Sequence, residues 1–273
     1  MFSWAAQAQI PAGYYDRAAG KSGGELRWAL HVIVRNHRVI PYSSATQLDT
    51  SDALKRLEED PTDTNLVRLV YSGLSAPKAH FGDVSGWNRE HLWPNSYGLD
   101  DVEPAFSDLH NLRAVDATVN SSRGNKWFDR SDLGDARYAK PAHEEALLSS
   151  ADSDSWEPGE EEKGDIARAL FYMAVRYTGD KAGEPRLVLT DRTDEVTSST
   201  NLMSRLTTLL LWHLADPVDA REQRRNELVF ALYQGNRNPF VDHPEWVVHA
   251  FGPRLEVLCP QCEQLEVSPR LNE

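Results

Sequence analysis

The feature of this sequence that most constrains its fold is the stretch 86–128, in which strand-like segments alternate with turn residues. Its first part is short, aromatic and polar, and Pro94 and a nearby glycine end it, so we predict a brief strand that runs into a loop. Apolar and polar residues alternate over 109–115, which predicts a second strand. Asp116 can then cap a helix that runs through about Asn125. The stretch therefore predicts strand, long loop, strand and helix.

The side chains of this stretch have the chemistry that metal-assisted phosphodiester hydrolysis needs. The imidazole of His91 can take a proton from water, since an unperturbed histidine has a pKa of about 6.5. Mg²⁺ prefers oxygen ligands and keeps several waters, so Glu90 and Asn120 suit it. Asn120 lies one helical turn after Asp116 and can point back at the first strand. Glu90 and His91 are neighbours on that strand, so a local bend has to bring both to one site.

Several motifs, in order along the chain, resemble the endonuclease I family of bacterial nucleases, which belongs to the His-Me finger (ββα-metal) superfamily. The motifs lie at 10–15, 88–94, 108–113, 120–125, 163–169 and 234–240. The likeness runs from about residue 10 to about residue 250.

This resemblance implies roles for individual residues. His91 is expected to be the general base, and Glu90 and Asn120 are expected to bind one divalent cation, Mg²⁺ or else Mn²⁺ or Ca²⁺. The substrate is expected to be DNA, RNA or both, cut with little regard to base sequence. An arginine is expected to steady the phosphate, with Arg113 as the first choice and Arg89 as its rival.

We predict an α+β fold: a mainly helical single domain, residues 1–273, around a His-Me finger (ββα-metal) core at about 86–128, with a short C-terminal tail at about 253–273. A chain of 273 residues with 40% hydrophobic residues can bury a sizeable core. We expect a monomer.

Outside the core, apolar periodicity and turn residues predict further elements. Helices are expected over 25–34, from Ser51 through Leu57, from a cap at Asp165 onward, over 201–214 and over 219–233, and a strand over 66–71. Residues 149–162 are rich in Ser, Asp and Glu, which indicates a solvated surface loop. Residues 1–24 are expected to form an arm that packs through Tyr14 and Tyr15.

The net charge of −13 weighs mildly against a protein that holds nucleic acid by nonspecific attraction, because such binding rewards Lys and Arg along the phosphates. We therefore expect positive charge to be concentrated locally and the metal to share the task. No apolar run approaches the roughly 20 residues of a transmembrane helix. The N-terminus lacks the basic start and apolar core of a secretory signal, so the chain is either intracellular or a mature fragment with an added methionine. The resemblance favours the second, an extracellular or periplasmic protein.

Other chemically active residues have a plain structural explanation beside the functional one. Cys259 and Cys262 are two thiols, a local disulfide or half of a metal site, but a zinc site needs about four ligands. His110 either contacts phosphate or bonds to backbone, and His213 lies on an apolar helix face, which favours a place in the core. Asp242 and His243 indicate a turn rather than a metal pair.

Basic residues near the C-terminus offer two further candidates. Arg237 lies in a Gly-, Asn- and Pro-rich turn and is expected to line a groove if the resemblance holds. Arg221, Arg224 and Arg225 form a basic patch on a helix, expected to be a solvated face or a nucleic-acid track.

Two functions of different class fit the sequence. The first is a magnesium-dependent endonuclease. The second is a catalytically inactive, nucleic-acid-binding relative of the same fold. Glu90, His91 and Asn120 are all present, which favours the enzyme, and a nuclease assay with and without EDTA separates the two.

Overall fold

The computed structural model describes residues 10–197, 200–203 and 205–252. Its helices are α1 (Gly23–Val34), α2 (Thr50–Leu57), α3 (Ala117–Arg123), α4 (Lys163–Arg176), α5 (Leu206–Ala215), α6 (Ala220–Leu228), α7 (Pro239–Asp242) and α8 (Glu245–Phe251). Its strands are β1 (Leu66–Arg68), β2 (Ser75–Pro77), β3 (Trp87–His91), β4 (Leu112–Asp116), β5 (Trp127–Phe128), β6 (Ser150–Ala151), β7 (Ser155–Glu157), β8 (Val188–Leu189) and β9 (Leu202–Met203). The fold is mixed, with helix predominating over strand, as the sequence predicts.

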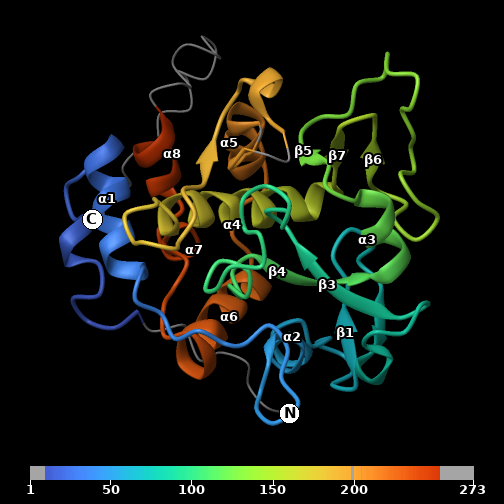
Figure 1. The fold of residues 1–273 in the computed structure, drawn as a ribbon, viewed down its shortest axis with the longest axis horizontal. Helices are drawn as coiled ribbons and strands as arrows, with labels where there is room; N and C mark the ends of the chain where they lie inside the picture. Colours follow the sequence, from blue (N-terminus) through green and yellow to red (C-terminus); the bar gives the residue numbers. More distant parts are fainter. Residues whose placement is uncertain (1–9, 198–199, 204, 253–273) are drawn as a thin grey trace, which may run out of the picture.

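Helix α4 runs across the middle of the molecule, and the other elements are arranged around it (Figure 1). Helices α1, α5 and α7 pack on it. Apolar residues of these helices join Val115 of β4 and Val119 of α3 in one hydrophobic cluster. The predicted strand, loop, strand and helix at 86–128 is therefore fixed to the helical part through a shared core.

The opposite face of the β3–β4 pair packs into a second hydrophobic cluster. Trp87, Leu112 and Ala114 lie there against Leu54 of α2 and Val67 of β1. Since side chains alternate between the two faces of a strand, both faces of this small sheet are covered. That coverage fixes its register, because a slip by one residue would exchange the two sets of side chains.

Three predicted elements, β4, β1 and α4, have different bounds from those expected. Strand β4 begins at Leu112 rather than at residue 109, because the backbone before it turns with Asn111 N donating to Asp108 O. Strand β1 ends at Arg68, and the chain then turns at Tyr71, which has a φ of 73°. Helix α4 begins before Asp165, which lies inside the first turn and does not cap it.

Further corrections concern residues 149–162 and helices α5 and α6. Residues 149–162 are not a solvated loop: they contain β6 and β7, whose Trp156 is fully buried. Helix α5 begins at Leu206, because residues 202–203 pair instead with β8. Helix α6 ends at Leu228 and continues as a π-helical turn, Val229–Tyr233.

The arginines predicted to form a basic patch pair with carboxylates. Arg225 is buried, so the expectation was wrong for it, whereas Arg221 and Arg224 stay partly exposed, with 33% and 20% of their side-chain surface accessible. The Arg225 Nε lies 2.7 Å from Glu58 Oε1, and Arg221 pairs with Asp165 at 3.2 Å. Arg237 is fully buried between Glu227 and Asp242, so it does not line a groove. The sequence could not reveal these pairs, because the partners of Arg225 and Arg221 come from distant segments.

Other structural expectations are confirmed. The described part of the arm, residues 10–24, packs through Tyr14 and through Tyr15, which is buried and donates its hydroxyl hydrogen to Asp242. His213 is buried in the core. Within the described ranges, no helix is long and apolar enough to cross a membrane. Cys259 and Cys262 lie outside those ranges.

Candidate active site

The site is built on β3, β4 and α3. Strands β3 and β4 are antiparallel, with Glu90 opposite Arg113 and His91 opposite Leu112. Helix α3 follows β4 directly because Asp116 caps it, accepting hydrogen bonds from Thr118 N at 2.8 Å and Val119 N at 3.1 Å. The helix packs on both strands. The cap therefore fixes the point at which the chain leaves the sheet and turns α3 back onto β3.

Glu90 is buried where β3 meets α3, and one of its two oxygens is held from two sides. Its Oε1 accepts a hydrogen bond from the Tyr71 hydroxyl at 2.6 Å and lies 3.0 Å from Arg123 Nη1. Burial raises the pKa of the Glu90 carboxyl, although Arg123 and Tyr71 act in the opposite direction. Among the described residues, none forms a hydrogen bond with Oε2. Oε2 is thus available to another ligand.

Asn120 is also held through one polar atom of its side chain, the amide nitrogen. Its amide nitrogen donates to Asn88 Oδ1 at 2.6 Å and to the Arg89 carbonyl at 3.1 Å. A carbonyl can only accept, so this contact assigns the nitrogen to the strand side and sets the orientation of the amide. In the described part of the chain, Asn120 Oδ1 has no hydrogen-bond partner. Since Asn88 and Glu90 lie on one face of β3, the Asn120 amide and the Glu90 carboxylate are on the same side of this strand.

His91 lies on the opposite face of β3 from Glu90. Its pairing with Leu112 is regular, so the bend expected to bring both side chains to one site is not found within β3. The His91 ring stacks on Phe106 and Tyr42, with centroids 4.9 and 5.5 Å away, and its Nε2 lies 2.8 Å from the Phe106 carbonyl. Since a carbonyl only accepts, Nε2 carries the hydrogen and Nδ1 keeps its lone pair. Burial lowers the pKa of His91 to about 4, so the imidazole is neutral at pH 7. No direct contact joins its side chain to Glu90 or Asn120 among the described residues.

The two candidate arginines have different surroundings. Arg113 is buried, with its Nη1 donating to the His110 carbonyl at 3.2 Å and its Nε 4.0 Å from Glu58. Burial, together with the nearby Arg225, lowers the pKa of Arg113 to about 10. Its guanidinium therefore interacts with buried groups of the protein rather than with solvent.

Arg89 lies on the same face of β3 as His91. Its guanidinium stacks 3.6 Å from the Tyr42 ring centroid and donates to neutral oxygens, among them Thr50 Oγ1 at 3.1 Å and Ser43 Oγ at 3.2 Å. Over the described ranges, no carboxylate pairs with it. Arg89 thus keeps its positive charge uncompensated beside His91.

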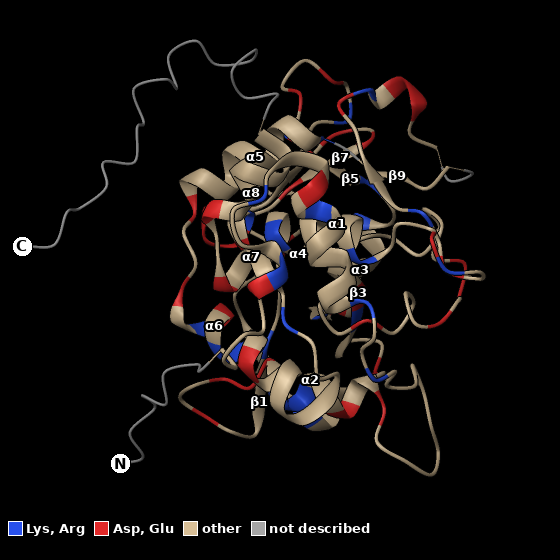
Figure 2. Cartoon of the chain, turned by 90° about the vertical axis from the view of Figure 1, so that its left-hand side faces the viewer, with Lys and Arg blue, Asp and Glu red and all other residues tan. Residues whose placement is uncertain are grey.

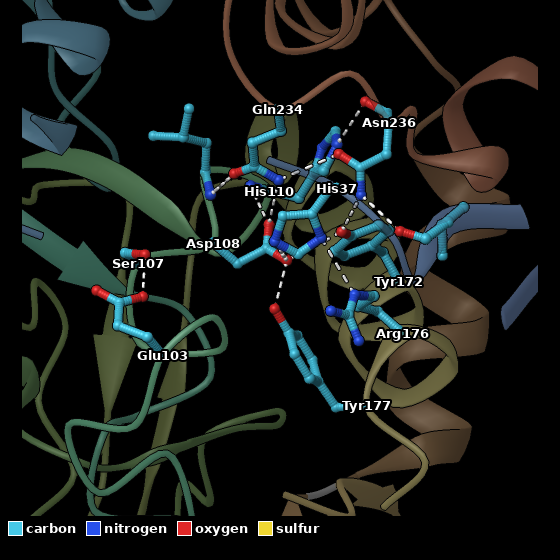
Figure 3. A network of polar contacts seen from close by, with 12 residues as sticks. His37, Glu103, Ser107, Asp108, His110, Tyr172, Arg176, Tyr177, Gln234 and Asn236 are labelled. Atoms are coloured by element: carbon cyan, nitrogen blue, oxygen red, sulfur yellow. Dashed lines mark hydrogen bonds and ion pairs between the residues drawn. The ribbon is translucent and has the colours of Figure 1, made fainter. Parts of the chain in front are cut away.

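The motif at 108–113 has a structural role that the sequence did not reveal (Figure 3). Asp108 is fully buried, and its Oδ2 accepts hydrogen bonds from the Tyr172 and Tyr177 hydroxyls at 2.9 and 2.8 Å. Its Oδ1 accepts from Gln234 Nε2 at 3.1 Å. His110 is buried beside Asn236, its Nε2 3.4 Å from the Asn236 carbonyl, so the backbone-bonded alternative is confirmed. This network joins the start of β4 to α4 and to the turn after α6.

Three residues of the site were missed by sequence reasoning. Tyr71 and Arg123 hold Glu90, and Asn88 holds Asn120. Arg123 lies one helical turn after Asn120, a signal that could have placed it on the same face of α3. No local pattern points to Tyr71, whose contact with Glu90 depends on the turn after β1.

The oxygens left without partners fit a small, hard cation. Mg²⁺ is commonly held by one or two protein oxygens, with waters and substrate phosphates completing its shell. One carboxylate oxygen of Glu90 and one amide oxygen of Asn120 match that donor set. No cluster of three or more His, Cys, Asp or Glu side chains suited to a metal occurs in the ranges that the structure describes, so a site made wholly of such ligands is not found there.

Comparisons with known proteins agree with the motifs. The family model described as Endonuclease I matches residues 22–245. The chain is 46% identical to an extracellular ribonuclease of Bacillus amyloliquefaciens and 45% identical to one of Bacillus subtilis (strain 168), each over 85% of this chain and 76% of the relative. It is 26% identical to Endonuclease-1 of Buchnera aphidicola over 50% of this chain and 44% of that protein. The chain therefore belongs to the endonuclease I family of nucleases.

Proposed function

We propose that this protein is an extracellular, metal-dependent endonuclease that hydrolyses phosphodiester bonds in RNA and DNA with little sequence specificity. The observation that carries the proposal is the way in which Glu90 and Asn120 are held. Neighbouring groups bind Oε1 of Glu90 and the amide nitrogen of Asn120. One oxygen of each residue, Glu90 Oε2 and Asn120 Oδ1, therefore remains for a cation. The names of the two Bacillus relatives support RNA as a substrate and an extracellular location.

In this proposal each residue has one task. Glu90 Oε2 and Asn120 Oδ1 hold one divalent cation, Mg²⁺ or else Mn²⁺ or Ca²⁺, which when bound offsets negative charge on the phosphate and on the leaving oxygen. His91 accepts a proton from water at Nδ1, because its Nε2–H is engaged by the Phe106 carbonyl. Bound phosphate beside the ring favours the protonated imidazole, which raises the low pKa of His91 during the reaction.

Arg89 rather than Arg113 steadies the phosphate. Arg89 shares a strand face with His91 and has no acidic partner among the described residues, whereas Arg113 is buried near Glu58. A guanidinium without a carboxylate partner keeps its charge for the substrate, and its planar donors match phosphate oxygens.

The chemistry touches only phosphate and water, so it does not depend on the base or on the 2′-hydroxyl. Phosphate contacts carry no direct sequence information, and we therefore expect both sugars to be accepted. The test is digestion of matched DNA and RNA oligonucleotides of several sequences with Mg²⁺ and, in parallel, with EDTA. Cleavage in EDTA would exclude metal dependence, and cutting confined to one short motif would exclude low specificity.

Metal binding is tested separately by calorimetric titration of the metal-free protein with Mg²⁺ and Mn²⁺. Glu90→Gln and Asn120→Ala should each weaken binding, because few protein ligands hold the ion. Asn65→Ala, at an exposed position near β1, is the control. Unchanged affinity in both site variants would remove these residues from the metal site. The inactive-relative alternative predicts nucleic-acid binding without cleavage under every ion, and the complete set of three residues argues against it.

A further inference from the structure

We propose that Tyr71 is a positioning residue that aims Glu90 at the divalent cation, and that Glu162 holds Tyr71 in place for this purpose. This inference rests on the proposed function, since it assumes that Glu90 is a metal ligand. It adds two residues that come from outside the strand–strand–helix core.

Tyr71 and Arg123 both act on the same oxygen of Glu90. The Tyr71 hydroxyl donates to Oε1 at 2.6 Å, and Arg123 Nη1 lies 3.0 Å from that atom. A carboxylate with one oxygen held by two groups cannot rotate freely, so the position of Oε2 is fixed as well. Without the hydroxyl, a single Arg123 contact would hold Oε1, and the carboxylate could turn about it.

The conformation of Tyr71 is unusual for its residue type. Its φ is 73°, in the left-handed region that bulky residues rarely adopt. Such a conformation persists only where the surroundings enforce it. At Tyr71 the backbone N donates to Glu162 Oε2 at 2.8 Å, and the ring lies against Trp156 with centroids 5.3 Å apart. The residue is fully surrounded, with only 2% of its surface exposed.

The contacts of Tyr71 form a chain from α4 to β3. Glu162 is buried at the N-terminal end of α4. Tyr71 donates its backbone N–H to Glu162 and its hydroxyl hydrogen to Glu90, so it connects the two carboxylates. The preceding residue, Val70, donates its N–H to the Ala114 carbonyl of β4 at 2.8 Å. The turn that carries Tyr71 is thus tied both to the helical part and to the sheet that bears Glu90.

The experiment is a calorimetric titration of metal-free protein with Mn²⁺ and with Mg²⁺. Tyr71→Phe keeps the ring and removes only the hydroxyl. We expect its affinity for the ion to fall about 10-fold, the lower end of what losing a partner that orients a metal ligand costs. Tyr15→Phe is the matched control: Tyr15 is also buried and donates to a carboxylate, Asp242, at 2.7 Å, and its metal affinity should equal that of the wild type.

A double-mutant cycle separates positioning from a general loss of structure. In the Glu90→Gln background, Tyr71→Phe should cause little further loss of affinity, because the oriented carboxylate is already gone. Additive losses would overturn the inference. Glu162→Ala removes the support of the Tyr71 backbone and leaves the Tyr71 side chain intact. It should also lower the affinity for the ion, and it provides the test if Tyr71→Phe does not fold.

The failure of this inference differs from the failure of the proposed function. If Glu90→Gln weakens binding but Tyr71→Phe and Glu162→Ala bind as the wild type does, only the positioning role is wrong. If Glu90→Gln also binds as the wild type does, Glu90 is not a ligand and both proposals fall.

Discussion

His91 is the residue on which the proposed chemistry depends most. Its Nε2–H is held by the Phe106 carbonyl, so Nδ1 is the ring atom left to accept the proton. His91→Ala should lower kcat by about 10²- to 10⁴-fold, the usual contribution of a positioned general base. Calorimetric metal affinity should be unchanged, because His91 is not a ligand in this scheme.

Free imidazole in the assay provides the control for His91→Ala. It can occupy the space left beside the adjoining rings of Phe106 and Tyr42 and should restore part of the rate. A variant that cleaves at the wild-type rate without imidazole would mean that another group takes the proton.

The two arginines should respond to substitution in opposite ways. Arg89→Ala should lower kcat/KM by about 10²-fold, as the loss of one charge-stabilising donor does, with a smaller effect on stability. Arg113→Gln should instead lower the free energy of unfolding by about 1 to 2 kcal/mol, because it removes the buried guanidinium that donates to the His110 carbonyl while Glu58 stays paired with Arg225. Urea unfolding and steady-state kinetics on both variants provide the comparison, and the reverse pattern would restore Arg113 as the phosphate contact.

At this scale the sequence could predict where candidate residues lie when their placement depends on neighbouring residues. Glu90, His91 and Asn120 stand in recognisable motifs, and Asn120 meets β3 as the helical spacing after Asp116 predicts. Tyr71 could not be predicted, because its role depends on a left-handed turn and on Glu162, a residue distant in the sequence.

Among the elements, α3 is the one whose stability matters most to the site, because it carries Asn120 and Arg123. Asp116→Ala removes a cap that accepts hydrogen bonds from Thr118 and Val119, and it should lower the free energy of unfolding by about 1 kcal/mol. We expect a loss of activity beyond the unfolded fraction, since the start of the helix positions Asn120.

Asp219→Ala is the matched control for the α3 cap. Asp219 caps α6 through Glu222 N at 2.7 Å, away from β3. It should cost similar stability in urea unfolding but leave the activity of the folded protein unchanged. Equal activity in both variants would show that α3 needs no cap to hold Asn120.

The elements also show why some predictions failed. The cap at Asp116 depends only on neighbouring residues, so it could be predicted. The strands within 149–162 depend on partners elsewhere: β7 pairs with β5 as well as with β6, and Trp156 is buried between distant segments. Similarly, residues 202–203 become β9 because β8 pairs with them, although the apolar pattern predicts a helix. Tertiary pairing overrode composition in both cases.

For the whole molecule, buried neutral histidines predict acid sensitivity. Burial lowers the pKa of His110 to about 3 and that of His213 to about 4. In the unfolded chain these groups bind protons near pH 6.5, so the unfolded state binds more protons below that pH. The contribution of these two histidines to the free energy of unfolding should therefore be complete above about pH 6.5 and fall as the pH drops toward 4, by at most about 3 kcal/mol for His213.

Urea unfolding as a function of pH measures this effect. His213→Gln stays neutral at every pH and should reduce the slope between about pH 6.5 and about pH 4. His249→Gln, at an exposed position on α8, controls for the replacement of a histidine. A slope in His213→Gln equal to that of the wild type would show that this side chain does not contribute.

The burial of arginines has a consequence for how the enzyme meets a polyanion. Arg113, Arg123, Arg168, Arg176, Arg225 and Arg237 are buried among carboxylates, so little of their charge reaches the solvent. Acidic residues mark loops and helix ends, with Lys and Arg scattered among them (Figure 2). With a net charge of −13, long-range repulsion should slow the approach of substrate. Raising the ionic strength from about 0.01 M to about 0.1 M shortens the Debye length from about 30 Å to about 10 Å, so kcat/KM at fixed Mg²⁺ should rise with added salt, the opposite of the response of a basic nuclease.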